Sequence, residues 1–331
     1  MNVQPQCAIY DTVMRGRGVT AAAQTRDRTG QARPAVSVVV PCYNGGRFID
    51  ALMRSLARQT FRDFEIVIVD DGSRDADTLA KLSALGDAAR VVRQDNAGPS
   101  AARNAGVRAA RADILFMLDC DDTIEPNFLA ETVALLAASP ADVGMVFSDI
   151  RLAGAESGVS TRYFNRFDLL FTNTLSSGLV MRRAAFEAAG GYDAAMRDGY
   201  EDWDFSLRLA RAGFRGVRLA KPLYIYQIAN VTAPSRSTVI DNRRLYAALW
   251  RYIREHHAES YTVPAMLALW RATRDGTGRV PLWKGIAAYV LALVLPDAMF
   301  NLMIAHLHRG ARADRPDADA AAPAAAPLTQ S

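Results

Sequence analysis

From residue 36 to residue 118 the chain alternates between short apolar runs and longer amphipathic stretches. The apolar runs are rich in valine, isoleucine and other strand formers and end in turn residues, which is typical of buried strands. Between them, apolar side chains recur every three or four positions, as on one face of a helix. Strands are predicted at 36–40, 64–69, 90–93 and 114–118, and helices at 48–56, 76–85 and from Gly98-Pro99-Ser100 onward. This alternation predicts an α/β fold with a mostly parallel, doubly wound sheet.

The pattern changes after residue 122, and beyond residue 230 only helical patterns remain. Further helices are predicted at 126–138, 183–189, 203–212, 239–257 and 264–274, and further strands at 143–147, 177–181, 214–219 and 223–226. We expect a flexible N-terminal segment (1–33), an α/β domain (34–230), a C-terminal helical region (231–310) and a disordered Ala/Pro-rich tail (311–331).

Composition narrows the choice of partner and compartment. The chain has 331 residues and a net charge of +4, with 39 Lys+Arg nearly balanced by 35 Asp+Glu. No basic stretch is interleaved with aromatic residues, so we expect no nucleic-acid partner. The 3 cysteines are odd in number and lack the spacing of a zinc site, and the N-terminus has no apolar signal-peptide core. A reducing, cytoplasmic location fits these features.

Three carboxylates directly follow the strand at 114–118. Asp119, Asp121 and Asp122 would lie at the carboxyl edge of the sheet, where α/β folds bind their ligands. Carboxylates this crowded repel one another unless a cation lies between them, and an all-oxygen site suits Mg²⁺ or Mn²⁺. The alternative is an acidic turn that caps the next helix, with Pro126 in its first turn.

Two more acidic groups are candidates for the same site. Asp70 and Asp71 end a neighbouring strand, whereas Glu201, Asp202 and Asp204 lie in a glycine-flanked loop before a helix, where one of them could instead be an N-cap. The 4 histidines all lie beyond residue 255, so a Ser-His-Asp or Cys-His mechanism has no base in the α/β region. The P-loop and dinucleotide-binding glycine motifs are also absent. What remains is a metal-phosphate site beside a carboxylate base, which fits transfer from a phosphate-activated donor.

Arg103 is a candidate ligand of that donor. It lies near the start of the helix that Gly98-Pro99-Ser100 opens, where free N–H groups favour phosphate and the helix dipole disfavours a cation. This placement favours a ligand role, and a solvated arginine is the alternative.

Six segments together resemble glycosyltransferase family 2, whose members are inverting, nucleotide-sugar-dependent enzymes with the GT-A fold. The segments are VSVVVPCYN (36–44), QTFRDFE (59–65), VDDGS (69–73), NAGPSAARN (96–104), LDCDD (118–122) and GGYDAAMRDGYEDWD (190–204). Each is weak alone, but they occur in the family's order and spacing over about residues 34–230. The resemblance implies a Rossmann-like GT-A sheet flanked by helices, here followed by a C-terminal helical extension.

On the donor side, the resemblance implies a role for each matching residue. Pro41 and Tyr43 match positions that line the nucleotide base, and Asp71 matches an aspartate that hydrogen-bonds it. Arg103 matches a further nucleotide contact. The Asp-x-Asp pair is Asp119 and Asp121: Asp121 matches the direct metal ligand, and Asp119 contacts the donor ribose or sugar and can share the metal.

On the acceptor side, Asp202 matches the catalytic base, and Glu201 would orient the acceptor hydroxyl. Trp203 would form part of the acceptor wall or, equally, pack in the core. The implied reaction is one in-line displacement, in which Asp202 deprotonates the acceptor and the nucleoside diphosphate leaves with Mn²⁺ or Mg²⁺. Many relatives carry a histidine after the last core strand; here Gln227, Asn230 or water would complete the metal shell.

Two other functions are weaker interpretations. A nucleotidyltransferase on a similar fold would have a basic glycine-rich loop after the first strand, and here no basic residue precedes Arg47. A non-catalytic glycan-binding relative would have lost the carboxylates, and all of them are present. The sequence identifies neither the donor sugar and base nor the acceptor, the linkage or the oligomeric state. A cell-envelope polysaccharide, a lipopolysaccharide or a lipid-linked saccharide would each fit as acceptor.

Two apolar runs over 281–308 suggest contact with a membrane surface. Each is shorter than the roughly 20 residues that a spanning helix needs. Trp283, Lys284, His308 and Arg309 flank the pair as interfacial residues would. We expect peripheral attachment to the inner face of the plasma membrane; the alternative is a helical pair packed on the catalytic domain or in a dimer contact.

Overall fold

The computed structural model describes residues 33–155, 157–175, 178–197, 199–228, 243–273 and 278–296, together with residue 299. The predicted flexible N-terminal segment, apart from Arg33, and the predicted disordered tail lie outside these residues. Most of the second apolar run of the C-terminal region lies outside them as well.

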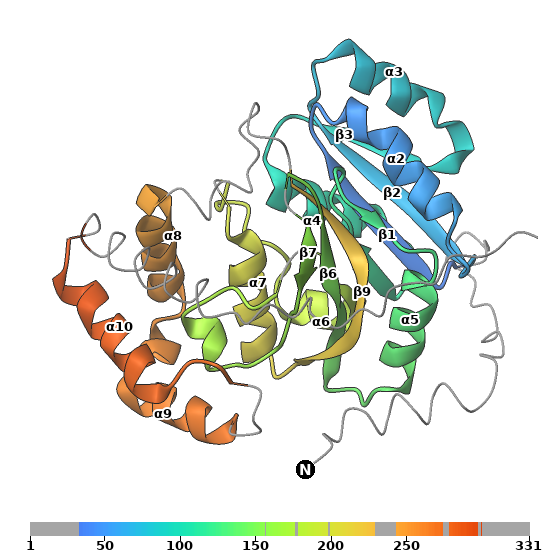
Figure 1. Cartoon of the computed structure of the whole chain (residues 1–331). Coiled ribbons are helices and arrows are strands. Elements are labelled where there is room, and N and C mark those ends of the chain that lie inside the picture. The colour runs from blue at the N-terminus through green and yellow to red at the C-terminus, as the bar shows by residue number, and fades with distance from the viewer. Residues whose placement is uncertain are drawn as a thin grey trace, which may run out of the picture.

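One nine-stranded sheet organises the chain, and helices lie on both of its faces (Figure 1). The strands are β1 (Val36–Cys42), β2 (Phe64–Asp71), β3 (Arg90–Gln94), β4 (Ile114–Met117), β5 (Thr123–Ile124), β6 (Val143–Gly154), β7 (Gly158–Ser160), β8 (Val180–Arg182) and β9 (Arg215–Ile228). The helices are α2 (Gly46–Ala57), α3 (Ala76–Ala84), α4 (Pro99–Ala109), α5 (Phe128–Ala138), α6 (Arg183–Ala188), α7 (Glu201–Arg211), α8 (Arg243–His256), α9 (Val263–Ala272) and α10 (Leu282–Val294).

The strand order is β3-β2-β1-β4-β8-β6-β9-β5, with β7 paired to β6. β1 is parallel to β2 and β4, and β2 is parallel to β3, so the carboxyl ends of these four strands share one edge. β8 runs antiparallel between β4 and β6, and β6 is parallel to β9. The predicted α/β fold, with a largely parallel sheet between helices, is confirmed.

Side chains of β1 alternate between two buried layers. Val38 and Val40 pack in a core with α2 and α5, whereas Val39 faces the opposite side of the sheet, where α4 lies. α4 approaches the sheet closely at Gly106, where an added Cβ would lie 2.3 Å from Cγ1 of Val39. A larger residue there would push α4 away from the sheet, together with Arg103 on that helix.

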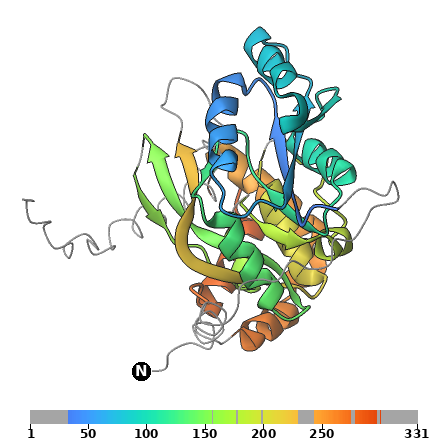
Figure 2. The ribbon, with the colours of Figure 1, turned by 90° about the vertical axis from the view of Figure 1, so that its right-hand side faces the viewer.

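The C-terminal helices pack on α7 and share a third apolar core with it. Trp203 and Leu207 of α7 contribute to this core, as do Trp250 and Ile253 of α8. Figure 1 places α8, α9 and α10 on the side of the molecule away from α2 and α3, and Figure 2, seen from the right-hand side of Figure 1, shows these orange helices behind the sheet. None of the described helices combines the length and the apolar character that crossing a bilayer requires.

Several predicted element boundaries differ from the structure: the strand predicted at 143–147 continues to Gly154 as β6, the strand predicted at 177–181 is β8 (Val180–Arg182), and the helix predicted at 203–212 begins at Glu201. The strands predicted at 214–219 and 223–226 are one strand, β9, which continues through Pro222. Its register with β6 shifts between Ser148 and Ile150, so the proline falls in an irregularity of the ladder where no N–H is needed. The helix predicted from Pro126 begins instead at Phe128, after β5 has formed.

Candidate active site

Three parallel strands bring the predicted donor residues to one edge of the sheet. Pro41 of β1 pairs in register with Val69 of β2, and β1 also pairs with β4, which Asp119 follows after one more residue. Tyr43, just beyond β1, is 48% exposed, so its ring is open to a ligand. The structure therefore brings together the residues predicted to bind the nucleotide and the metal.

Asp71 is buried at this edge and holds the loop that leads into α4. Its Oδ1 accepts hydrogen bonds from Gln94 Nε2 and from the main-chain N–H of Ala97, and its Oδ2 accepts one from Gly98, each at 2.8 Å. Gly98 has a φ of 91°, a conformation that glycine adopts without strain. Asp71 thus shapes the start of α4, and one lone pair on Oδ2 is left for the predicted contact with a base.

The acidic run after β4 divides into two kinds of carboxylate. Asp122 is buried, and it accepts hydrogen bonds from the hydroxyl of Tyr224 (2.6 Å) and the main-chain N–H of Gln227 (2.9 Å), both on β9. Asp119 and Asp121 are only partly buried. The helix that follows is capped at Asn127, not by these carboxylates, so the acidic run is not a helix cap. Asp122 is structural, and its two neighbours remain for a ligand.

The chemistry of Asp119 and Asp121 fits a divalent cation. Burial, and then the negative charge of Asp119, raise the pKa of Asp121 to about 6. A cation near both carboxylates would relieve this repulsion. Within the described part of the chain, no three acidic, histidine or cysteine side chains gather as a complete metal site. Two carboxylates completed by water and diphosphate oxygens are the usual arrangement for Mg²⁺. Asn230, one candidate for a third ligand, lies outside the described residues.

Arg103 links the donor side of the edge to helix α7. It is 4% exposed, and its Nη2 lies 2.5 Å from Oδ1 of Asp119 while its Nη1 lies 2.7 Å from Oε1 of Glu201. Its guanidinium also lies over the ring of Tyr192, 5.2 Å from the centroid. Burial would lower the pKa of Arg103, but the charges of Asp119 and Glu201 outweigh it and raise the pKa well above the ordinary value. Arg103 is therefore a buried cation between two carboxylates, not a solvated arginine.

Asp202 lies beside this bridge, in the first turn of α7. Its Oδ2 accepts a hydrogen bond from Asn173 Nδ2 (2.9 Å), and its Oδ1 accepts one from the main-chain N–H of Trp203 (2.8 Å). Burial, and then the charge of Glu201, raise the pKa of Asp202 to about 6. The N-cap of α7 is Tyr200, in a left-handed conformation at φ 59°, so no acidic side chain of this loop is the cap. Asp202 has the environment of a proton acceptor that works near neutral pH.

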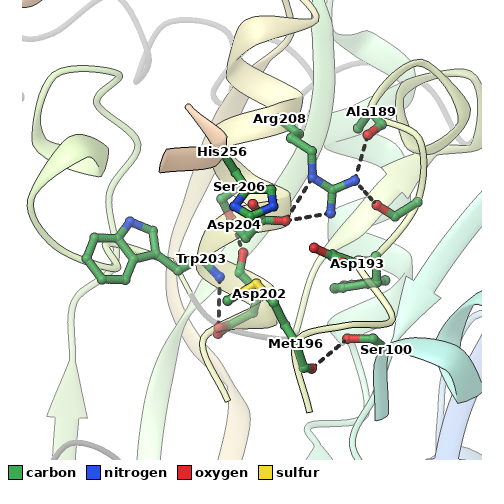
Figure 3. A network of polar contacts seen from close by, with 12 residues as sticks. Ser100, Ala189, Asp193, Met196, Asp202, Trp203, Asp204, Ser206, Arg208 and His256 are labelled. Atoms are coloured by element: carbon green, nitrogen blue, oxygen red, sulfur yellow. Dashed lines mark hydrogen bonds and ion pairs between the residues drawn. The ribbon is translucent and has the colours of Figure 1, made fainter. Parts of the chain in front are cut away.

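Asp204 has the opposite environment, two residues further along the helix. Its Oδ1 lies 2.8 Å from His257 Nε2, and Arg208 Nε donates to its Oδ2 at 2.8 Å. Burial would raise the pKa of Asp204, but the His257 contact and the charge of Arg208 lower it overall. Figure 3 shows the guanidinium of Arg208 between Asp204 and the carbonyl oxygen of Ala189. Asp204 is a structural carboxylate that fixes α7.

The side chain of Trp203 points away from Asp202 and Arg208 (Figure 3). It is fully buried in the core shared with the C-terminal helices, and its Nε1 donates to the carbonyl oxygen of Leu169 at 2.6 Å. Of the two positions that the sequence left open, the structure places Trp203 in the core and not in an acceptor wall.

Two functional neighbours were missed by sequence reasoning. Asn173 lies in an irregular aromatic-rich segment, and His257 lies beyond the α/β region. Nothing in the local pattern links either residue to the aspartate that it contacts.

Comparison with known proteins points to one family. The family model described as "Glycosyl transferase family 2" matches residues 37–187. EpsH of Bacillus subtilis is 40% identical over 97 residues, which cover 29% of this chain but only 28% of that protein. A "PGL/p-HBAD biosynthesis glycosyltransferase" of Mycobacterium bovis is 33% identical over 186 residues, 54% of this chain and 70% of that protein.

The fold also matches solved structures. One is the mannosyltransferase PcManGT from Pyrobaculum calidifontis, crystallised with GDP-Man and Mn²⁺. Its TM-score is 0.52 at 19% sequence identity, and the match covers 93% of each chain. At this identity the likeness concerns the fold alone.

Proposed function

This chain belongs to glycosyltransferase family 2, and from that premise we propose that it transfers a sugar from a nucleoside-diphosphate donor to a hydroxyl acceptor, with inversion at the anomeric carbon. The observation that carries the proposal is the double contact of Arg103. This side chain bonds Asp119 on the donor side and Glu201, the neighbour of Asp202, on the acceptor side. One buried cation thereby sets the distance between the donor carboxylates and the base.

We assign the proton transfer to Asp202. With a pKa of about 6, its carboxylate is mostly ionised at neutral pH and is still basic enough to accept a proton from an acceptor hydroxyl. The side chain of Asn173 and the main-chain N–H of Trp203 hold the carboxylate in place. Glu201, already bonded to Arg103, has a second oxygen that could orient the hydroxyl.

We assign donor binding to the sheet edge. Tyr43 and Pro41 would contact the nucleotide base, and Asp71 would reach it through its remaining lone pair. Asp119 and Asp121 would hold Mn²⁺ or Mg²⁺, which when bound offsets the negative charge of the diphosphate.

The names of relatives guide the choice of acceptor. One matched relative acts in PGL/p-HBAD biosynthesis, and another is named an O-antigen biosynthesis protein. A cell-envelope glycan or a lipid-linked saccharide is therefore the acceptor class we propose. We place the reaction on the cytoplasmic side of the membrane, where the buried free thiols of Cys42 and Cys120, with Sγ atoms 3.6 Å apart, would stay reduced.

A lipid-linked acceptor would require contact with a bilayer, and α10 offers a suitable surface. Trp283, Val290, Leu293 and Val294 are 67%, 47%, 61% and 70% exposed. The described parts of α9 and α10 carry arginine and lysine but no carboxylate, which favours an anionic surface. We propose that α10 lies on the lipid headgroups.

Vesicle sedimentation tests this contact. The protein should sediment with phosphatidylglycerol vesicles, and Trp283→Ser with Val294→Ser should stay in the supernatant. Val159→Ser, which changes a 55%-exposed valine on β7, is the matched control. Failure of the unmodified protein to sediment would exclude the membrane contact.

The transfer proposal is tested by nucleotide binding followed by turnover. UDP, GDP, CDP and dTDP are screened by thermal stabilisation, with and without Mn²⁺; a ligand at about 100 times its dissociation constant adds roughly 2.7 kcal/mol to the folded state. Asp202→Asn should keep the nucleotide response and lose sugar transfer. Normal turnover by this variant would exclude Asp202 as the base.

A further inference from the structure

Arg162 lies beside the proposed base without taking part in the contacts described so far. It follows β7, and its main-chain N–H donates to Oδ1 of Asp149 at 3.1 Å. The next residue, Tyr163, donates its main-chain N–H to the carbonyl oxygen of Thr174. Because Thr174 directly follows Asn173, which holds Asp202, this pairing brings the Arg162 segment alongside the base.

The guanidinium of Arg162 has no hydrogen-bond or ion-pair partner among the described residues, and its Nε is buried. The nearby carboxylate of Asp149 is neutralised by Arg218, whose Nε and Nη2 lie 2.8 Å and 2.6 Å from its oxygens. Burial lowers the pKa of Arg162, and the negative charge of Asp202 is foremost among those that oppose this effect. Arg162 is partly buried, and no described residue pairs with its charge, so the guanidinium is open to an anion that arrives with a ligand.

Three more buried polar atoms on residues around the site lack partners within the described part of the chain. They are Nε of Arg103, Oγ1 of Thr174 and the hydroxyl of Tyr192. The ring of Tyr192 lies under the guanidinium of Arg103, which bonds both Asp119 and Glu201. Unpaired buried polar atoms are rare in native proteins and call for an explanation. Thr174 directly follows Asn173, which bonds Asp202, and Tyr192 lies under Arg103, which bonds the neighbouring Glu201, so these unpaired atoms belong to residues next to those that hold the site's carboxylates.

We assign the anion that would pair with Arg162 to the acceptor and not to the nucleotide-sugar donor. The main-chain hydrogen bond from Tyr163 to Thr174 joins the Arg162 segment to the residue after Asn173, which holds Asp202, and no contact between described residues joins Arg162 to Asp119 or Asp121. The donor carboxylate Asp119 already has its own cation in Arg103.

We propose that Arg162, with Thr174 and Tyr192, forms an acceptor subsite that binds an anionic group, a phosphate or a carboxylate, next to the hydroxyl that Asp202 deprotonates. This inference rests on the proposed function and adds a substrate class to it: a phosphorylated or acidic saccharide. A neutral sugar would leave the Arg162 cation unpaired in the complex.

Isothermal titration with three probes tests the subsite. Glucose 1-phosphate, glucuronate and glucose are titrated into the full chain, with and without the nucleotide that the thermal screen selects. One of the two anionic probes should bind at least tenfold more tightly than glucose, and which one does so separates phosphate from carboxylate recognition. Arg162→Gln should bind all three probes alike and keep its nucleotide affinity. Arg162→Lys, which retains the charge, should keep part of the preference.

Arg108→Gln, which changes an exposed arginine on α4, is the matched control and should behave as the unmodified protein. Three results would overturn the inference: no preference for either anion in the unmodified protein, an undiminished preference in Arg162→Gln, or a loss of nucleotide affinity in that variant. The last result would assign Arg162 to the donor diphosphate. Absence of nucleotide binding by the unmodified protein would count against the proposed function, while the titrations without nucleotide would still decide the subsite.

Discussion

Asp202→Asn should make the protein more stable while abolishing transfer, and Asp204→Asn should make it less stable. The two aspartates lie two residues apart on α7, yet their surroundings act in opposite directions. The pKa of Asp202 is raised by burial and by Glu201, whereas the pKa of Asp204 is lowered because His257 and Arg208 outweigh its burial. The pair therefore provides a matched test of the charge distribution around the proposed base.

The magnitude for Asp202 follows from its pKa, which is about 6 in the folded chain against an ordinary 3.8. Each pKa unit corresponds to about 1.4 kcal/mol, so the ionised carboxylate costs the folded state at most about 3 kcal/mol at pH 7. Asparagine removes the charge, but it has one acceptor oxygen for the two N–H donors of Asn173 and Trp203, which costs about 1 kcal/mol. The net gain is about 2 kcal/mol, or a few °C in melting temperature.

The sign of the pH dependence is fixed by the same values. Below about pH 4 the carboxyl group of Asp202 is protonated in both folded and unfolded chains, so the variant gains nothing there. Between about pH 4 and pH 6 the unfolded chain releases the proton first, and the gain grows. Above about pH 6 the gain is complete.

Denaturant unfolding of the unmodified protein and both variants from pH 4 to pH 8 measures these differences. Asp204→Asn should lose roughly 3 kcal/mol at pH 7, because it leaves Arg208 without its buried carboxylate. The reasoning is refuted if Asp202→Asn is no more stable than the unmodified protein at pH 8, or if its gain does not change with pH.

Three further predictions concern activity and the donor edge. Because transfer requires ionised Asp202, kcat/KM should fall below pH 6 to about a tenth of its plateau at pH 5; a flat profile from pH 5 to pH 8 would contradict this role. Arg103→Met should destabilise the chain by roughly 3–5 kcal/mol and weaken nucleotide binding, since it leaves Asp119 and Glu201 without their shared cation, whereas Arg108→Met should change neither property. Chelation with EDTA should remove the thermal response to the nucleotide in the unmodified protein, and Asp121→Asn should lack a metal-dependent response from the start; a response that survives both treatments would exclude metal at this edge.

The parts of the fold that sequence predicted well depend on local patterns. β1, β2 and β4 are short apolar runs ended by polar residues, and their parallel pairing places Asp71 and Asp119 at one edge, as the alternation of strands and helices implies. β9 was predicted as two strands, at 214–219 and 223–226, and only the register shift opposite β6 shows how one strand continues through Pro222.

The details of the site depend on contacts between residues far apart in sequence, which no local pattern encodes. Arg103 and Glu201 are separated by 98 positions, and Asp204 and His257 by 53. From the sequence, Arg103 was predicted to lie at a helix start and to bind the donor. The sequence could not reveal that two carboxylates of the chain already share this cation. The unpaired Arg162 was equally invisible, because the absence of a partner is a property of the fold.

The contact between Asp204 and His257 limits how this chain could be divided or recombined. A shortened chain that ends after β9 would lose His257 and the indole of Trp250, so α7 would expose Trp203 and leave Asp204 with Arg208 alone. The helix that carries the proposed base would then lack its outer support. A chimera that joins this sheet to the C-terminal helices of another relative would have to supply both an imidazole for Asp204 and an apolar face for Trp203. The sheet and the C-terminal helices are thus expected to be inherited together, although their sequence patterns differ.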